Sequence, residues 1–218
     1  MGIFDSIEGV VQMRKKLAFY KSKATANVKL DSCYLCKQKS TSFCKSHSVP
    51  QFCLKNIAVD GKVSYINTVL KNPCIDMSEG INRAGVFKII CRSCDSKWFQ
   101  AYENPSSYEK KITEQIMAQI SLKDSLLMLS KRNYEKELYK LLINENEDIA
   151  IMSLSQLQSI DADLIDHEKM FNRAKKICMD GRDNSKKNYQ LRFYEVLNYV
   201  VPLAFQGPIA LRVGFDKK

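Results

Sequence analysis

The stretch that decides the fold is CYLCKQKSTSFCKSHSVPQF, residues 33–52, together with IICRSCDSKWFQAYENP at residues 89–105. Each segment contains two cysteines separated by two residues. This spacing lets a tight turn present both thiolates to one ion, while backbone N–H groups of the turn soften the charge on the sulfurs. The sequence therefore predicts a structural zinc site with four thiolate ligands, which are Cys33, Cys36, Cys91 and Cys94.

The first segment offers a second ligand set by itself. His47, one of two histidines in the chain, lies close to three cysteines. This set would be a tetrahedron of three thiolates and one imidazole, from Cys33, Cys36, Cys44 and His47. It would leave the second cysteine pair, Cys91 and Cys94, without partners. A redox dithiol is a further alternative, although no thioredoxin-like βαβ pattern surrounds either pair. The other cysteines are predicted to be small buried apolar residues; these are Cys53, Cys74 and Cys178.

The composition is that of a soluble globular protein that can bury a core. The chain has 218 residues, of which 45% are hydrophobic and 27% are charged, and it shows no repeat or low-complexity tract. Residues 1–23 include Arg14, Lys15 and Lys16, so they lack the apolar run of a signal peptide or membrane span. We therefore expect a cytoplasmic protein without a transmembrane segment, in which reduced cysteines favour metal over disulfides.

The charge of the chain favours polyanionic partners. There are 34 basic and 24 acidic residues, which give a formal net charge of +10. The excess is spread along the chain and is not gathered in one tail, which argues against a disordered basic arm. Such an excess favours encounter with DNA, RNA or an anionic membrane surface, and of these we expect nucleic acid as the partner.

The order of predicted elements indicates an α+β protein that is mainly helical. Residues 1–30 contain an amphipathic helix over 3–23. Residues 31–105 form the zinc module, with β-like pieces at KVSYINTVL (62–70) and GVFKIIC (85–91) and with a helix after Cys94. Residues 106–218 form a helical region that ends in two short strands.

Within 106–218 the pattern predicts one long helix or a kinked pair from 106 to about 148, capped by Ser106 or Ser107. A second helix over 153–179 ends at Gly181, and a shorter one covers YQLRFYEVLNYV (189–200). Two short apolar strands are predicted within 203–215. Such strands need a partner sheet, so we expect a homo-oligomer or a protein partner through this region.

The arrangement of a cysteine pair, then SHSVP, then a second pair running into a helix as CRSCDSK, resembles the HNH endonuclease superfamily. The resemblance covers about residues 31–105 and implies a zinc-stapled treble-clef, or ββα-metal, fold. It also implies that His47 is the general base that activates a water against a phosphodiester, with one divalent ion stabilising the phosphate.

The resemblance assigns further residues and also shows departures from the family pattern. Asp95 stands where the family places a His or Asn metal ligand, and Glu103 on the same helix could supply a second carboxylate for Mg²⁺ or Mn²⁺. Ser46 stands where the family has a metal-binding acid, and no Asn precedes Cys91 at the family's distance. The nucleic-acid contacts implied are Lys45, Arg92 and Lys97.

The sequence thus predicts a metal-dependent nuclease that hydrolyses DNA or RNA, and the resemblance implies a role in prokaryotic defence or a mobile element. Two alternatives stay open. One is a non-catalytic zinc module that binds nucleic acid or a protein partner, in which His47 is a structural residue. The other is a purely structural zinc protein that assembles through its helices. His167 is predicted to be a surface or helix-face residue.

Overall fold

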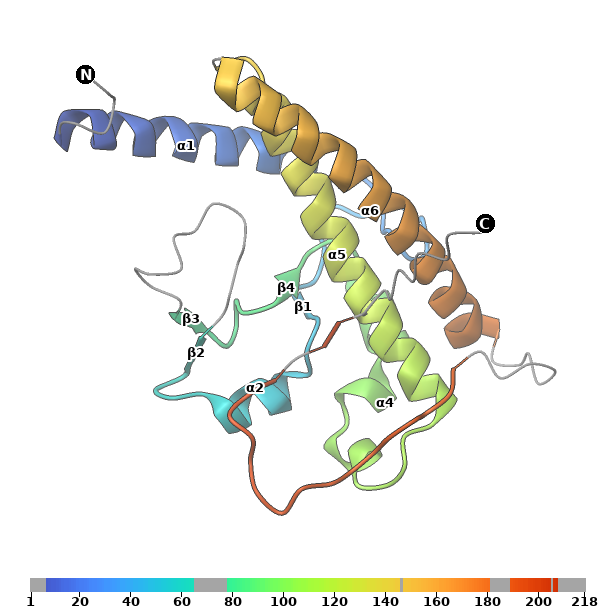
Figure 1. Ribbon diagram of the computed structural model, residues 1–218. Helices are drawn as coiled ribbons and strands as arrows, with labels where there is room; N and C mark the ends of the chain where they lie inside the picture. The colour runs from blue at the N-terminus through green and yellow to red at the C-terminus, as the bar shows by residue number, and fades with distance from the viewer. Residues whose placement is uncertain (1–6, 65–77, 146, 181–188, 205, 208–218) are drawn as a thin grey trace, which may run out of the picture.

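The computed structural model describes residues 7–64, 78–145, 147–180, 189–204 and 206–207, and it shows a mainly helical α+β protein with short strands (Figure 1). Two long helices lie side by side, and the small elements that carry the cysteines pack against one of them. The predicted class, α+β and mainly helical, is confirmed.

The cysteine-containing part combines short helices with two small antiparallel ladders. Its helices are α2 (Gln51–Ile57), α3 (Arg92–Trp98), α4 (Gln100–Glu103) and the 3₁₀ turn η1 (Pro105–Tyr108). Its ladders pair β1 (Ser46–His47) with β4 (Val86–Phe87) and β2 (Lys62–Ser64) with β3 (Ser78–Gly80).

The β1–β4 ladder depends on a tight approach at its start. Gly85 has φ +65°, and a Cβ at this position would lie 2.9 Å from Ser48 Oγ. Both facts favour glycine, because L-residues with a side chain rarely adopt this φ. The Ser48 N–H donates to the Gly85 carbonyl at 3.0 Å, so the turn fixes the register of β1 against β4.

The helical part is a hairpin with a third helix attached near one end. α5 (Glu114–Leu142) and α6 (Glu147–Asp180) run antiparallel, and Arg132 pairs with Asp163 across them at 3.0 Å. α1 (Ile7–Asn27) projects from the hairpin and meets α5 (Figure 1). There the Asn27 amide donates to Glu137 at 3.3 Å.

The main core joins the cysteine-containing part to the hairpin. Leu122, Leu126 and Leu129 of α5 are buried in one cluster with Phe99 and Tyr102. The same cluster contains residues of α6 and two of the predicted zinc ligands, which are Phe171, Ala174, Cys178, Cys33 and Cys94. Because both parts share this core, the cysteines sit on the hairpin and do not form a separate lobe.

Several predicted helix boundaries are wrong. α5 begins at Glu114, not at 106, and its N-cap is Thr113, whose Oγ1 accepts from the Ile116 N–H at 3.3 Å. Ser106 lies in η1, where Asn104 caps the turn. α6 begins at Glu147, earlier than the predicted residue 153.

The predicted helix over 189–200 is also wrong, because residues 189–204 form no helix in the structure. They run as an extended segment past α4 and α2 (Figure 1). The segment is rich in aromatic and β-branched residues, which disfavour helix, and an isolated helix this short is marginal without packing. It is instead fastened by the Tyr194 hydroxyl, which donates to the Tyr108 carbonyl, and by the Gln206 amide, which donates to the Ile120 carbonyl at 3.0 Å.

Other predicted elements are tested only in part. Of the predicted strand 62–70, residues 62–64 form β2, and the rest lies outside the described residues. The predicted C-terminal strands fall largely on 208–218, which also lie outside them. Cys74 and Gly181 lie outside the described part of the chain as well.

Candidate metal centre

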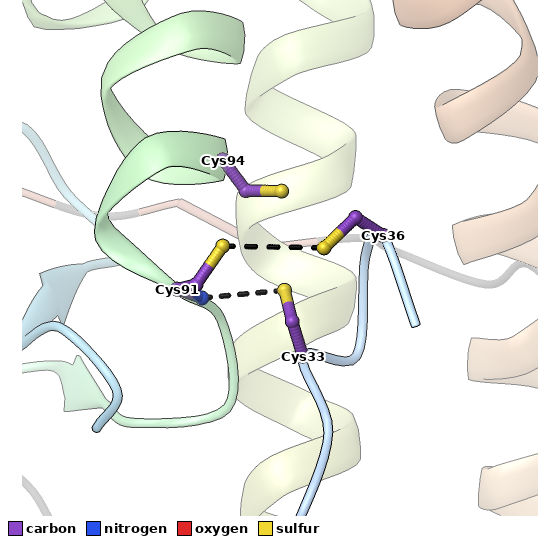
Figure 2. A group of neighbouring side chains, drawn as sticks. All are labelled: Cys33, Cys36, Cys91 and Cys94. Carbon is purple, nitrogen blue, oxygen red and sulfur yellow. Dashed lines mark hydrogen bonds between the residues drawn. The ribbon is translucent and has the colours of Figure 1, made fainter. Parts of the chain in front are cut away.

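Four cysteine sulfurs converge where the loop after α1 meets the start of α3 (Figure 2). The Sγ atoms of Cys33, Cys36, Cys91 and Cys94 all lie within 4.8 Å of one another. Cys36 Sγ and Cys91 Sγ are 4.0 Å apart, which is too long for a disulfide. Thiolates held at about 2.3 Å around a tetrahedral zinc would lie about 3.8 Å apart, so the group can hold a metal ion such as zinc.

The backbone around the first cysteine pair forms the tight turn that this chemistry needs. The Cys33 N–H donates to the Gln38 carbonyl and the Lys37 N–H to the Cys33 carbonyl, both at 2.8 Å. Lys37 takes a left-handed conformation with φ 62°. The Cys91 N–H donates to Cys33 Sγ at 3.2 Å, so a backbone dipole from the second cysteine pair stabilises negative charge on a sulfur of the first pair.

The thiols differ in their readiness to ionise without a metal. Burial raises the pKa of Cys33 and of Cys94. Burial alone would also raise the pKa of Cys91, but hydrogen bonds with the Ser93 hydroxyl and the Cys94 backbone N–H outweigh it and lower that pKa to about 6. Four thiolates at this distance repel one another, so a bound cation is needed to hold all four deprotonated.

The alternative ligand set is not assembled in this structure. Cys44 Sγ lies 3.4 Å from the Ile90 carbonyl, with which it forms a hydrogen bond, and Cys44 is not in the four-cysteine cluster. The Nε2 atom of His47 lies 2.9 Å from the Ile81 carbonyl, which is its hydrogen-bond partner. The four-thiolate set is therefore the one that the described residues bring together.

The predicted acidic ligands of the catalytic ion surround a lysine. Lys123 Nζ, which comes from α5, lies 2.8 Å from Asp95 Oδ1 and 3.2 Å from Glu103 Oε1. It also donates to Ser46 Oγ at 2.7 Å, and its ammonium lies 4.3 Å from the centre of the Phe99 ring. The Lys123 side chain is fully buried. The Lys123 ammonium group therefore pairs with both carboxylates in the place where a metal cation was expected.

His47 and Asp95 are not brought to the same side of the strand. Ser46 Oγ donates to Asp95 Oδ1 at 2.7 Å, and side chains of adjacent residues in a strand point to opposite faces. His47 is bonded instead to the Ile81 carbonyl on the segment before β4. The His47 side chain is thus half-buried, forms a hydrogen bond to the backbone and does not face the Asp95 carboxylate.

Sequence reasoning missed Lys123, although a signal for it was present. Ile116, Gln119, Lys123 and Leu126 recur at spacings of three and four, which place them on one face of a helix. All four are buried. A lysine in the apolar stripe of a helix predicts a buried partner, and here the partners are Asp95 on α3 and Glu103 on α4, which the sequence analysis placed on one helix.

The predicted nucleic-acid contacts lie on the surface. The side chains of Lys45, Arg92 and Lys97 are exposed. Lys97 Nζ lies over the Trp98 ring at 4.7 Å from its centre. The three positions are accessible to a polyanion.

His167 is a partial correction to the sequence analysis. The sequence predicts a surface or helix-face residue; His167 does lie on α6, but it is buried, with 9% of its surface exposed, and its Nδ1 atom has no hydrogen-bond partner among the described residues. Burial lowers its pKa. Cys178 is buried as predicted, and Cys53 is half-buried.

No family model, curated protein or solved structure matches the chain. Among the helices in the described part of the chain, none combines the length and apolar character required to cross a membrane. The resemblance to the HNH superfamily thus stands on the cysteine pairs and the segment around His47 alone.

Proposed function

We propose that this chain is a zinc-stapled, treble-clef-like module without nuclease activity, and that it binds nucleic acid. The observation that carries the proposal is the ammonium group of Lys123, held 2.8 Å from Asp95 and 3.2 Å from Glu103. A zinc ion bound by the four cysteines would join two segments far apart in the chain and fix the module on α5.

The absence of nuclease activity follows from the place of this ammonium. A Mg²⁺ or Mn²⁺ ion would need the oxygens of Asp95 and Glu103 at about 2.0–2.2 Å, and it could not share them with a buried positive charge. The hydrogen bond between His47 Nε2 and the Ile81 carbonyl would leave Nδ1 as the basic nitrogen, so this bond does not itself argue against a nuclease. The metal half of a metal-and-base pair is the part that Lys123 blocks.

The charge distribution supports nucleic acid as the partner. Residues 1–105 carry 16 basic and 8 acidic residues, a net charge of +8, whereas residues 106–218 carry 18 and 16, a net charge of +2. The cysteine-containing part exposes many of these cations, including Lys29, Lys45, Lys55, Lys62, Lys88, Arg92 and Lys97. Such a surface attracts phosphate through counterion release.

An HNH-type nuclease is the second candidate, because one contact favours it. Ser46 Oγ and Asp95 Oδ1 lie 2.7 Å apart, and these are the two positions at which the superfamily binds its catalytic ion. In that case Lys123 would have to withdraw when metal and substrate bind, and His47 would act as the base.

One set of assays separates the candidates. Zinc content is measured first, with about one ion per chain expected. Fluorescence anisotropy with labelled single-stranded and duplex oligonucleotides is then recorded over a salt series, and cleavage of plasmid DNA and of RNA is followed with Mg²⁺ or Mn²⁺. We expect salt-dependent binding and no cleavage.

The control is His47→Ala, purified identically and with its zinc content confirmed. Cleavage by the parent that disappears in this variant would replace our proposal with the nuclease. A zinc-loaded protein that binds no nucleic acid would refute the proposed partner and favour a protein-binding or structural role.

A further inference from the structure

A large groove lies where the end of α1 meets α5, α6 and the edge of the cysteine-containing part. Its volume is about 1390 Å³. We call it the α1–α5 groove; it is lined by residues from 21–30, 41–43, 86–89, 127–137 and 164–168. Pockets for small molecules usually measure about 300–1,000 Å³, so the size of this groove favours a segment of a polymer.

The rim of the groove is cationic. Lys21, Lys29 and Lys88 line it, and none of the three forms an ion pair with another described residue. The carboxylates in the lining are already engaged. Glu137 pairs with Lys140 at 2.7 Å and accepts from Asn27, while Glu168 accepts from the Tyr34 hydroxyl. The Tyr34 hydroxyl does not neutralise Glu168, but Lys21, Lys29 and Lys88 outnumber this carboxylate, so the net charge of the rim is positive and suits an anionic ligand.

The floor of the groove is apolar and partly aromatic. Phe43 and Tyr134 contribute rings, and Val86, Ile89 and Leu127 contribute aliphatic side chains. In a duplex the bases are paired and stacked, so their faces cannot reach such a floor. A single strand can turn its bases onto apolar and aromatic side chains while its phosphates meet lysines at the rim.

We infer that the α1–α5 groove binds single-stranded nucleic acid, with unstacked bases on the floor and phosphates at the lysine rim. This inference rests on the proposed function and names the substrate class of that function. Lys29 follows α1 and Lys88 follows β4, so the cations that meet the phosphates come from two separate segments.

The first test reverses charge on the rim. Lys29→Glu combined with Lys88→Glu is compared with Lys110→Glu combined with Lys111→Glu, which makes the same change at exposed positions between η1 and α5, outside the groove and outside the basic region 1–105. The probes are labelled oligo-dT and oligo-U of about 15 nucleotides and a duplex of equal length. We expect the parent to bind the single strands at least tenfold more tightly than the duplex. The rim variant should lose at least tenfold in affinity, and the control less than threefold.

Salt dependence provides a second readout from neutral variants. Removal of one lysine–phosphate interaction lowers the slope of log K against log salt by about 0.7 for a single strand, so Lys29→Gln with Lys88→Gln should lower it by about 1.4. Photo-cross-linking with 5-iodouridine oligonucleotides should label Phe43 or Tyr134. Zinc content and circular dichroism confirm that each variant is folded.

The outcomes distinguish this inference from the proposed function. If the parent binds no nucleic acid, both fail. If it binds but the rim variant binds equally well, or if duplex binds as tightly as single strand, the groove inference is overturned and nucleic-acid binding stands. If an acidic, leucine-containing peptide binds the groove while oligonucleotides do not compete, the groove belongs to a protein partner and the inference is overturned.

Discussion

Lys123 is the centre of a network of charged and polar side chains. It is fully buried, whereas its partners Asp95 and Glu103 keep 28% and 38% of their side-chain surface exposed. Burial of an ammonium is costly, and good geometry with several partners offsets that cost. Here the partners are two carboxylates, the Ser46 hydroxyl and the face of Phe99.

Replacement of Lys123 by methionine should therefore destabilise the fold. The two carboxylates would lose their cation, but their partial exposure lets water compensate, so we expect a loss of about 1–3 kcal/mol in the free energy of unfolding. Urea denaturation measures it. The double variant with Asp95→Asn should lose less than the sum of the two single changes, whereas additive losses would show that the ion pair contributes nothing.

Asp124, the next residue, predicts a dependence of stability on pH. Burial raises its pKa from 3.8 to about 6, and its Oδ2 atom has no hydrogen-bond partner among the described residues. The folded state therefore binds a proton that the unfolded state has lost between pH 4 and 6. Through this group, the free energy of unfolding falls as pH rises across that window, by up to about 2–3 kcal/mol.

The variant Asp124→Asn should remove that slope. We expect it to be more stable than the parent at pH 7.5 and nearly equal to it at pH 4, as measured by urea denaturation at the two pH values. The difference in the free energy of unfolding between the parent and Asp124→Asn should change between pH 4 and 7. A difference that stays constant over this range would contradict the burial assigned to Asp124.

At the residue scale, the sequence predicted the four-cysteine cluster better than the charge network around Lys123. The spacing of the cysteine pairs is a local signal, because each turn presents two thiolates whatever surrounds it. The partners of Lys123 come from three separate segments, and only the fold brings them together. His47 shows the same limit, since its hydrogen bond to Ile81 depends on how β4 approaches β1.

At the scale of elements, helix caps decide where α5 begins. The sequence analysis named Ser106 or Ser107 as the N-cap, whereas the structure uses Thr113. Pro105 and the cap from Asn104 hold residues 105–108 in a 3₁₀ turn, which keeps Ser106 and Ser107 out of α5. Periodicity located α5 and α6, but it could not select among competing caps.

Replacement of Thr113 by alanine should lower the free energy of unfolding by about 1 kcal/mol, because the Ile116 N–H would lose its acceptor. Thermal denaturation and urea titration measure the change. Ser106→Ala is the matched control, since the Ser106 residue is exposed outside α5. A larger loss in the control would mean that the helix starts at the position predicted from sequence.

Segment 189–204 shows why the secondary structure of short segments is hard to predict from sequence. Its aromatic and aliphatic residues fit a helix pattern, yet many of them are exposed in the structure; these include Phe193, Val196, Tyr199, Val200 and Leu203. Hydrogen bonds from Tyr194 and Gln206 to distant backbone fix its path instead. Contacts that join residues 86 positions apart are not visible in a local pattern.

At the scale of the whole molecule, the four-cysteine cluster and the hairpin share one core. Cys33 and Cys94 belong to the same buried cluster as Leu122 of α5 and Phe171 of α6. Loss of the ion should therefore weaken the packing of the hairpin as well as the loop that carries the cysteines. The fold class could be predicted from sequence, but this shared core could not.

Metal removal tests that coupling. Cys36→Ser, or treatment with a chelator, should lower the thermal midpoint of a single cooperative transition by more than about 10 °C, because binding free energy at such sites is folding free energy. Differential scanning calorimetry and zinc analysis measure both effects. Cys53→Ser is the control, and it should keep the zinc; a hairpin that melts unchanged after zinc loss would contradict the shared core.

The separation of the two cysteine pairs also has a consequence for biosynthesis. Cys36 and Cys91 are 55 residues apart, so at about 5–20 residues per second a ribosome makes the second pair about 3–11 s after the first. During that interval the nascent chain offers an ion only two of its four thiolates. An ion captured early stays exchangeable, and the site closes only when the start of α3 has left the exit tunnel.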